Sequence, residues 1–141
     1  ELSVIGSYAY TDAEIIRDNS GFQGHRLPQA PKHAGSAWLR YIVKKIHPLN
    51  GFSFGIGVFA VAEREGDIQN TFKLPGYARL DAFAAYSTKL GATRLTAQIN
   101  ARNILDERYY ESNDPASNIG PRLGVYPGAP VTVLGSLRLE Y

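Results

Sequence analysis

The sequence contains no cysteine, so the chain forms no disulfide bond and offers no thiolate to a metal. It has no run of five like charges, and its net charge at pH 7 is only +2. A charge this small and evenly spread does not indicate a nucleic-acid-binding surface, and no nucleic-acid partner is expected. The first residues, ELSVIGSYAY, lack the positive segment and continuous apolar core of a signal peptide. They indicate a strand already under way, so residue 1 is expected to be an internal start.

Long apolar runs are missing as well. A membrane-spanning helix needs about 20 apolar residues, and no segment approaches that length. The most apolar segment, FSFGIGVFAVA at 52–62, is interrupted by glycines. Its length matches the roughly 9–11 residues of a tilted transmembrane β-strand. Hydropathy alone would class the protein as soluble, but barrel strands give a weak signal per segment.

Apolar and polar residues alternate with a period of two along most of the chain, which is typical of β-strands. The fifth predicted strand alternates best, with Leu95, Ala97 and Ile99 opposite Thr96 and Gln98. The sequence therefore predicts an all-β, antiparallel up-and-down meander of about six strands. These strands are expected at about 2–16, 34–46, 52–63, 77–88, 93–103 and 131–141.

The connections between these strands alternate in length. Residues 17–33, 64–76 and 104–130 are long, polar and rich in Gly, Pro, Asn and Asp, whereas 47–51 and 89–92 are tight turns. Alternate connections of a meander lie at the same end of the sheet. All the long loops are therefore expected at one end and both turns at the other, as in outer-membrane barrels.

Two other folds fit the same pattern. A soluble β-sandwich, such as a carbohydrate-binding module, would present its polar strand faces to water, where a large barrel presents them to its lumen. A small barrel closed by self-association is the third alternative. Strand aromatics favour a membrane barrel, because such residues form girdles at the interfaces, although they favour strands in general. The girdle candidates are Tyr8, Tyr10, Trp38, Tyr41, Tyr86 and Tyr141.

In LTAQINARNILDERYY at 95–110, an alternating strand runs into an Asn-x-x-Asp turn and two adjacent tyrosines. This segment is similar to the penultimate strand of the TonB-dependent outer-membrane siderophore receptors, which runs into Asn-Leu-Phe-Asp-x-x-Tyr. The matching residues are Asn103, Leu105 (usually Phe in the family), Asp106, Tyr109 and Tyr110.

Four further segments, in the right order, resemble the same family. GSYAYTDAEI at 6–15 resembles a barrel strand, and RLPQAPKHAGSAWLRY at 26–41 resembles the stretch that leads into a Trp-containing strand. LPGYARLDAFAAY at 74–86 is similar to a Leu-Pro-Gly-Tyr strand entry followed by an Asp. GAPVTVLGSLRLEY at 128–141 resembles the closing strand, with Val131 where Arg is common. The five segments are spread along almost the whole chain, from residue 6 to residue 141.

The resemblance implies that residues 1–141 are the C-terminal part of a barrel of about 22 strands, without its plug domain and earlier strands. It implies a location in the bacterial outer membrane, uptake of an iron(III)–siderophore complex, and neither enzymatic activity nor a cofactor. The implied partners are the iron–siderophore substrate, outer-membrane lipid, TonB on the plug side and the barrel-assembly machinery. Leu137, Leu139 and Tyr141, spaced by two, resemble the C-terminal signal that this machinery reads.

The residues after the fifth strand are expected to shape the rim of the barrel. Asn103 and Asp106 can bond nearby backbone groups and support a bend where the strand leaves the bilayer. A left-handed or bulged position near Asn103 would explain why the alternation slips at NIL. Tyr109 and Tyr110 are then expected at the outer rim.

Ligand contacts in the family are largely aromatic and Arg side chains on outward loops. The candidates here are Phe22, His25, Arg26, Phe72, Tyr109, Arg122 and Tyr126. No catalytic constellation and no metal site is expected. His25, His33 and His47 have no acidic residue at zinc-ligand spacing, and ESNDPASN at 111–118 lacks the spacing of a calcium-binding loop.

Overall fold

The computed structural model describes residues 1–44, 49–115, 122 and 124–141. Within these described residues the regular structure consists of β-strands, with no helix, and six of the strands are long. The long strands are β1 (Leu2–Tyr10), β2 (His33–Ile42), β3 (Phe52–Val61), β6 (Tyr77–Leu90), β7 (Thr93–Arg102) and β10 (Thr132–Glu140). The connections add the short strands β4 (Arg64–Glu65), β5 (Lys73–Leu74), β8 (Tyr110–Asn113) and β9 (Val125–Pro127).

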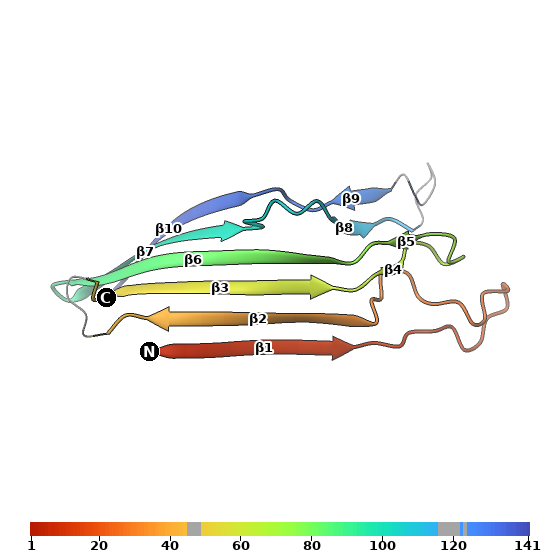
Figure 1. Cartoon of the computed structure of the whole chain (residues 1–141), viewed down its shortest axis with the longest axis horizontal. Helices are drawn as coiled ribbons and strands as arrows, with labels where there is room; N and C mark the ends of the chain where they lie inside the picture. The colour runs from red at the N-terminus through yellow and green to blue at the C-terminus, as the bar shows by residue number, and fades with distance from the viewer. Residues whose placement is uncertain (45–48, 116–121, 123) are drawn as a thin grey trace.

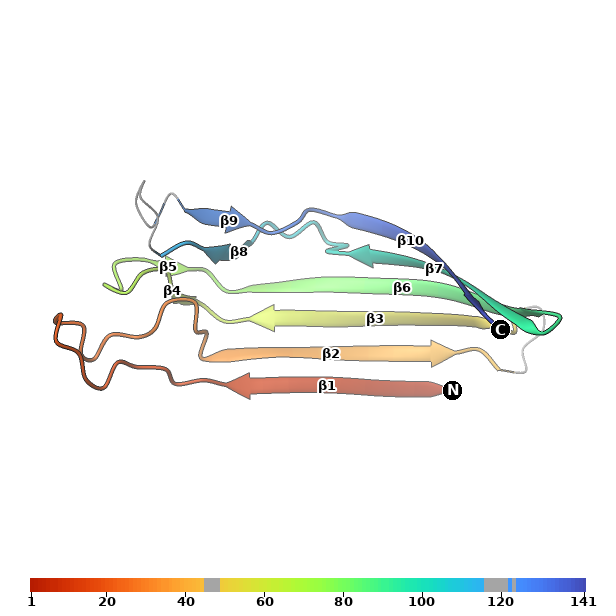
Figure 2. The same ribbon diagram turned by 180° about the vertical axis from the view of Figure 1, so that it is seen from behind.

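The six long strands form one antiparallel sheet in the order β1-β2-β3-β6-β7-β10. This is the predicted up-and-down meander (Figure 1). The three long loops lie together at one end of the sheet, which we call the loop end. The tight turn at 89–92, the described residues 49–51 of the other turn and both chain termini lie at the other, the turn end, as the view from behind also shows (Figure 2). The predicted sorting of connections by length is thus confirmed.

The prediction that the first strand runs to residue 16 was wrong. β1 ends at Tyr10, where its partner β2 begins at His33. Residues 13–15 instead pair inside their own loop: Leu27 N donates to Ala13 O (3.0 Å), and Ile15 N donates to His25 O (2.9 Å). The alternation beyond Tyr10 therefore belongs to a loop hairpin. Residues 45–48, which include His47 and the end of the predicted second strand, lie outside the described residues.

The two faces of the sheet differ completely in charge. Paired residues of an antiparallel sheet point to the same face, so the register assigns every strand residue to a face. On one face, the polar face, lie all the charged side chains of the six long strands: Arg40, Arg79, Asp81, Lys89, Arg94, Arg102, Arg138 and Glu140. The opposite, apolar face has no Asp, Glu, Lys or Arg in these described strands.

Aromatic side chains lie at both ends of the apolar face. Tyr8 and Tyr10 lie near the loop end, and Tyr41, Phe52 and Tyr86 lie toward the turn end. Tyr41 pairs with Leu2, eight residues before Tyr10 on β1. Eight residues of strand span about 27 Å, close to the roughly 25 Å apolar band of a membrane barrel.

Trp38 does not belong to these girdles, so that part of the prediction was wrong. The register pairs Trp38 with Gly57 on the polar face. Its ring lies over the glycine, where an added Cβ would be 2.3 Å from the indole, and its centroid lies 6.3 Å from that of Phe83. Because Gly57 has no side chain, the indole ring of Trp38 occupies the space above it.

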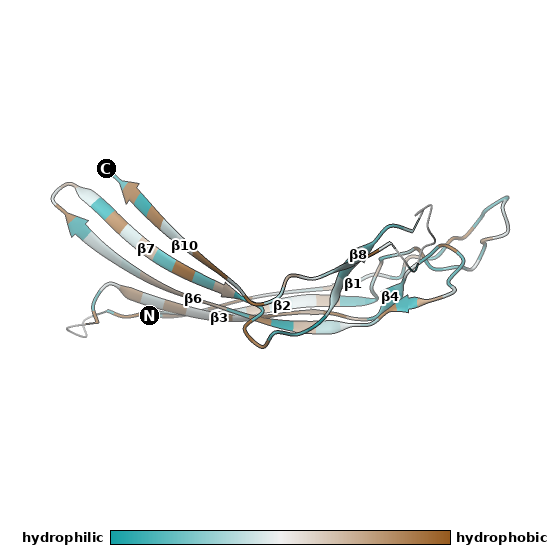
Figure 3. Cartoon of the chain, turned by 90° about the horizontal axis from the view of Figure 1, so that it is seen from above, coloured by the Kyte–Doolittle hydropathy of each residue, from teal (hydrophilic) through white to brown (hydrophobic). Residues whose placement is uncertain are grey.

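The sheet is a single bent layer (Figure 3). In the described residues no second sheet packs on either face of it, so the β-sandwich alternative was wrong. The apolar face consequently has large exposed side chains, for example Ile99 at 59% and Leu137 at 77%. β1 and β10 each pair on one side only, and the sheet does not close into a barrel within this chain. None of the described segments is a helix long and apolar enough to cross a membrane.

We expect Ile99→Arg to lower the free energy of unfolding from lipid vesicles by about 2–4 kcal/mol, because it places a charge on the apolar face. Gln98→Arg is the matched control, since Gln98 is the neighbouring residue of β7 and lies on the polar face. Urea titration of the protein folded into vesicles measures both values. Equal losses in the two variants would contradict the assignment of faces.

Candidate functional site: the outer rim and its loops

Asn103 directly follows β7 in a left-handed conformation, with φ of 54°, and its side chain is almost fully buried. Its amide Nδ2 donates to the carbonyls of Glu107 and Ala129, both at 3.0 Å. Its Oδ1 accepts the backbone N–H of Glu107 at 2.9 Å. One side chain thus holds the bend after β7 against the segment that leads into β10. The predicted left-handed position and backbone bonds of Asn103 are confirmed.

Asp106, three residues later, also has a positive φ and bonds the backbone of the bend. Its φ is 50°, its backbone N–H donates to Asn103 O (2.9 Å), and its Oδ1 accepts the backbone N–H of Val131 (3.2 Å). Asn and Asp tolerate positive φ better than other non-glycine residues, which explains why both types occur here. The NILD segment therefore ties the end of β7 to the start of β10.

A buried ion pair on β6 supports this rim from the polar face. Arg79 and Asp81 form two parallel hydrogen bonds, Nε to Oδ1 and Nη2 to Oδ2, both at 3.0 Å. Asp81 Oδ1 also accepts the backbone N–H of Asn103 at 2.8 Å. Arg79 Nη1 donates to the hydroxyl of Tyr109 at 3.1 Å. Sequence reasoning missed this pair, although the Asp that follows the LPGY segment is Asp81.

The two adjacent tyrosines occupy different environments. Tyr109 is 5% exposed, and its ring stacks on Tyr77 with centroids 4.2 Å apart. A Cβ at Gly128 would lie 2.1 Å from the Tyr109 ring, so only glycine fits there. Tyr110 is 44% exposed at the start of β8. Tyr109 therefore packs inside the rim, and little of it is left for a ligand to contact.

The three long loops are bonded to one another beyond the rim. Arg64 on the second loop donates through Nη2 to the carbonyls of Tyr110 and Glu111 on the third loop, both at 2.9 Å. The side chain of Asn113 donates to Gly66 O. Gln29 on the first loop exchanges bonds with the backbone of Asn113 and donates its own N–H to Glu65 O at 2.8 Å.

The first and second loops meet again at Asn70, a residue with φ of 55°. Its Oδ1 accepts the backbone N–H of Arg26 at 2.8 Å, and its Nδ2 donates to Arg26 O at 2.9 Å. The guanidinium of Arg26 binds Asp12 at 2.6 Å, and this hydrogen bond lowers the pKa of the Asp12 carboxyl. His25 Nδ1 lies 2.9 Å from Ile68 O. The three long loops therefore pack together as one unit, which we call the loop unit.

The other predicted ligand residues lie on this unit in small groups. The rings of Phe22 and His25 are in tilted contact, with centroids 5.7 Å apart and planes at 54°. The guanidinium of Arg122 lies 5.5 Å from the centre of the Phe72 ring and donates to Thr71 O at 3.1 Å. Tyr126, on β9, is 56% exposed. The structure therefore brings Phe22 together with His25, and Phe72 with Arg122, on the loop unit.

A charged hollow of about 210 Å³ opens among the loops. It is lined by Arg26, Lys32, Ala62, Glu63, Arg64, Glu65 and Lys73. Arg64 is only 6% exposed, burial lowers the pKa of its guanidinium, and its Nη1 has no hydrogen-bond partner among the described residues. Lys73 pairs with Glu63 at 2.6 Å, which raises the pKa of the lysine. Sequence reasoning missed Arg64, whose burial depends on contacts with a distant loop.

A family model of TonB-dependent receptor-like β-barrels matches residues 1–104. The chain belongs to this family. A metal-pseudopaline receptor of Pseudomonas aeruginosa PAO1 is 37% identical over 142 residues, covering 100% of this chain and 19% of the relative. A ferrioxamine B receptor of Salmonella typhimurium LT2 is 33% identical over 132 residues, covering 93% of this chain and 18% of the relative.

Solved receptor structures share the fold. BauA, the ferric preacinetobactin receptor from Acinetobacter baumannii, superposes with a TM-score of 0.81 at 24% identity, over 96% of this chain and 19% of its own. The unliganded ferric citrate transporter FecA gives a TM-score of 0.81 at 24% identity, over 98% of this chain and 20% of its own. This chain thus spans about a fifth of the length of the receptors it matches.

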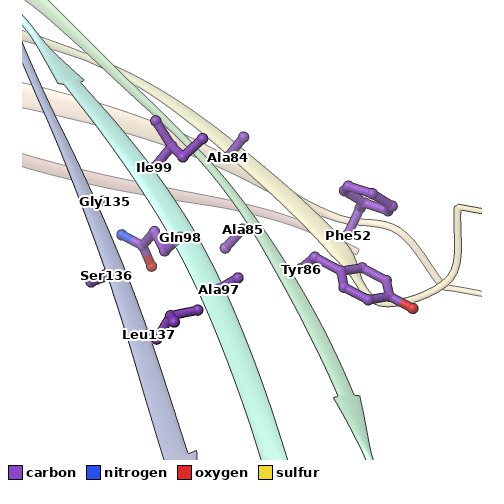
Figure 4. Close-up of a pocket in the computed structure, with 10 residues that line it drawn as sticks. All are labelled: Phe52, Ala84, Ala85, Tyr86, Ala97, Gln98, Ile99, Gly135, Ser136 and Leu137. Carbon is purple, nitrogen blue, oxygen red and sulfur yellow. The ribbon is translucent and has the colours of Figure 1, made fainter.

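Receptors of this family are proteins of the bacterial outer membrane. In such a barrel the apolar face of the receptor sheet contacts lipid and the polar face lines the lumen. The hollow of about 620 Å³ in Figure 4 is lined mainly by apolar-face residues, with Ala84, Ala97 and Gly135 between the larger Tyr86, Ile99 and Leu137. It is a depression in the lipid-facing surface and offers few polar groups to a ligand.

The described residues of the receptor contain no group of three His, Asp or Glu side chains placed to hold a metal ion. Tyr141 follows the last strand with its side chain fully exposed, while Leu137 and Leu139 lie on the apolar face.

We expect Asn103→Gly to cost about 2–3 kcal/mol of unfolding free energy, because buried backbone groups lose their side-chain partners. Asn103→Ala is expected to cost about 1 kcal/mol more, since alanine is also strained at positive φ. Urea unfolding of the receptor in lipid vesicles distinguishes the two variants. An alanine variant as stable as the wild type would show that the bend does not depend on Asn103.

Proposed function

We propose that this chain is the C-terminal part of the barrel of a TonB-dependent receptor that imports an iron(III)–siderophore complex across the outer membrane. The observation that carries the proposal is the segregation of charge between the two faces of one sheet, in a chain of this family. Relatives named for ferrioxamine B and for preacinetobactin support siderophores as the class of cargo. The receptor binds and moves its cargo and performs no catalytic reaction.

The cargo first binds to the loop unit. Siderophores surround iron with oxygen donors, and their complexes present polar oxygens together with ring or chain carbons. Aromatic rings and cationic side chains suit such a surface. The proposed contacts are the accessible members of the predicted set, which are Phe22, His25, Arg26, Phe72, Arg122 and Tyr126. Tyr109 contributes by holding the rim.

Arg64 adds an oxyanion-binding group to this set. Its Nη2 is occupied by the third loop, whereas Nη1 is free among the described residues and the side chain lines the charged hollow. A buried donor without a partner costs free energy. Arg64 is only 6% exposed, so a cargo oxygen recovers this free energy only when the loops around the hollow move apart on binding. Of the other cations around the hollow, Arg26 is paired with Asp12 and Lys73 with Glu63, so Lys32 is the one that joins Arg64 in favouring an anionic oxygen.

The remaining partners act elsewhere on the receptor. Outer-membrane lipid covers the apolar face, and TonB contacts the plug side from the periplasm to drive release of the cargo. The barrel-assembly machinery reads Leu137 and Leu139 on the last strand and Tyr141 directly after it. A strand with exposed apolar side chains and one unpaired edge suits such a role.

The test of the function is uptake of radioactive iron from siderophores in a strain that lacks the gene. We expect the gene to restore uptake of at least one iron(III)–siderophore complex, and deletion of tonB to abolish it. Uptake that is equal with and without the gene, across hydroxamate, catecholate and carboxylate siderophores, would refute the proposal.

We expect Arg64→Gln to weaken binding of the cargo about 10-fold or more, as loss of one charge-assisted bond predicts. Arg17→Gln is the control, because Arg17 is an exposed cation of the first loop outside the proposed contacts. Binding is measured on cells at equal receptor amount, and the thermal unfolding midpoint reports any disorder of the loops. Unchanged affinity in Arg64→Gln would remove Arg64 from the site.

The proposed place in a larger barrel makes a prediction about the gene. We expect the reading frame to continue upstream of Glu1 for roughly 500 residues or more, encoding a plug and further alternating strands. Sequencing of the locus decides this. A start codon or secretion signal directly before Glu1 would favour a self-associating small barrel.

A further inference from the structure

The charged hollow among the loops has one cation more than the acids that pair with its side chains. Its cationic lining residues are Arg26, Lys32, Arg64 and Lys73. Two acids line it as well, and Lys73 Nζ lies 2.6 Å from the carboxylate of Glu63 and 4.0 Å from that of Glu65. Arg26 is paired with Asp12 at 2.6 Å. Four cations are thus matched by three acids, which leaves one positive charge uncompensated among the described residues.

Lys32 and Arg64 are the two cations of the hollow without an acidic partner. Neither forms an ion pair of 4.0 Å or less with a described residue. Arg64 is 6% exposed, its Nη2 is bonded to the third loop, and its Nη1 has no hydrogen-bond partner among the described residues. Lys32 is exposed. One ligand can therefore meet an accessible cation first and a buried one afterwards, as the loops part.

The hollow is too small to enclose a whole iron complex. Its volume is about 210 Å³, whereas pockets that enclose a complete small-molecule ligand measure about 300–1,000 Å³. The donor oxygens of a siderophore point inward to the iron when the metal is bound. The part of the cargo that enters this hollow is therefore an arm whose polar group is not bound to iron.

We propose that the hollow binds a carboxylate on such an arm, and that the receptor therefore prefers siderophores that carry a carboxylate not bound to iron. This inference rests on the proposed function, since it needs a siderophore cargo. A carboxylate has two oxygens, one for Arg64 Nη1 and one for the ammonium of Lys32. Hydrogen bonds between charged groups are roughly twice as strong as those between neutral groups. The single negative charge of the arm matches the one uncompensated positive charge of the hollow.

Other polar groups suit the hollow less well. An amide or hydroxyl carries no charge, so the buried guanidinium of Arg64 would stay unpaired, which is costly. A phosphate carries a charge of about −1.5 to −2 at pH 7, which exceeds the excess positive charge of the hollow. An ammonium would be repelled by both Lys32 and Arg64. A carboxyl group has a pKa of about 4 and is ionised at neutral pH.

Three derivatives of one siderophore test the proposal with the full-length receptor in outer-membrane vesicles. In ferrioxamine B, for which a relative of this chain is named, three hydroxamates bind iron and a primary amine remains free at the end of an arm. N-acetylation makes this arm neutral, and N-succinylation ends it in a carboxylate, while the iron-binding groups stay the same. We expect the succinyl derivative to bind about 10-fold or more tightly than the acetyl derivative, and the parent amine to bind no better than the acetyl derivative. Equilibrium binding of the complexes loaded with radioactive iron measures the three affinities.

Matched variants assign the preference to the hollow. Lys32→Gln and Arg64→Gln are each expected to reduce the succinyl-to-acetyl affinity ratio to about 3-fold or less, because one of the two charged donors is lost. The ratio is the readout, since a general loosening of the loops would weaken both derivatives alike. Arg17→Gln is the control, because Arg17 is an exposed cation of the first loop that does not line the hollow, and it should keep the full ratio.

Three outcomes overturn the proposal. They are equal affinities for the succinyl and acetyl derivatives, no binding of the succinyl derivative, and a preference that persists in both Lys32→Gln and Arg64→Gln. Equal affinities together with TonB-dependent iron uptake would refute the carboxylate site and leave the transport function standing. The expected preference without any iron uptake would refute transport and leave the carboxylate site standing.

Discussion

The lack of hydrogen-bonding partners in lipid is the constraint on which this structure depends. Every backbone N–H and C=O at membrane depth must bond to protein, so the chain crosses the membrane as paired strands. Strands place successive side chains on opposite faces, and this geometry lets one face meet lipid while the other carries charge. The six strands follow that rule completely, because Arg, Lys, Asp and Glu occur on the polar face alone. Tyr10 and Tyr41 lie at opposite ends of the apolar face.

Where the strands leave the membrane, hydrogen bonds from side chains replace the backbone hydrogen bonds between paired strands. Asn103 and Asp106 bond the backbone of the bend, and the buried Arg79–Asp81 pair holds Asn103 from the neighbouring strand. Removing one partner of such a pair would leave the other charge buried and unpaired, which is costly in free energy. The pair therefore keeps the rim rigid beneath the loops. Beyond it, Arg64 and Asn113 join the second and third loops. The loops are therefore packed against one another on a firm base.

Much of this architecture was predictable from local pattern. The alternation in β7 is confirmed residue by residue, and the long loops and short turns lie at the ends where their lengths placed them. Asn103 and Asp106 were identifiable because their residue types favour positive φ. Other features depend on register or on distant contacts. Trp38 alternates like a girdle residue, yet its strand pairs it with Gly57 on the polar face. Tyr109 looks like an exposed rim aromatic until Tyr77 and Gly128 enclose it.

The amino-acid sequence by itself determined the strand count, the charge difference between the faces and the composition of the loops, because each depends on periodicity or on single-residue preference. The tertiary structure alone decided to which face a side chain at a strand end points. It also decided which cations of the loops are buried and which acidic side chains are near enough to pair with them. Arg64 on one loop is buried by carbonyls of another, and Arg40 and Lys89 share a hollow across β3. Such meetings depend on the spacing of strands in the sheet, and no local sequence signal encodes a neighbour that lies forty residues away.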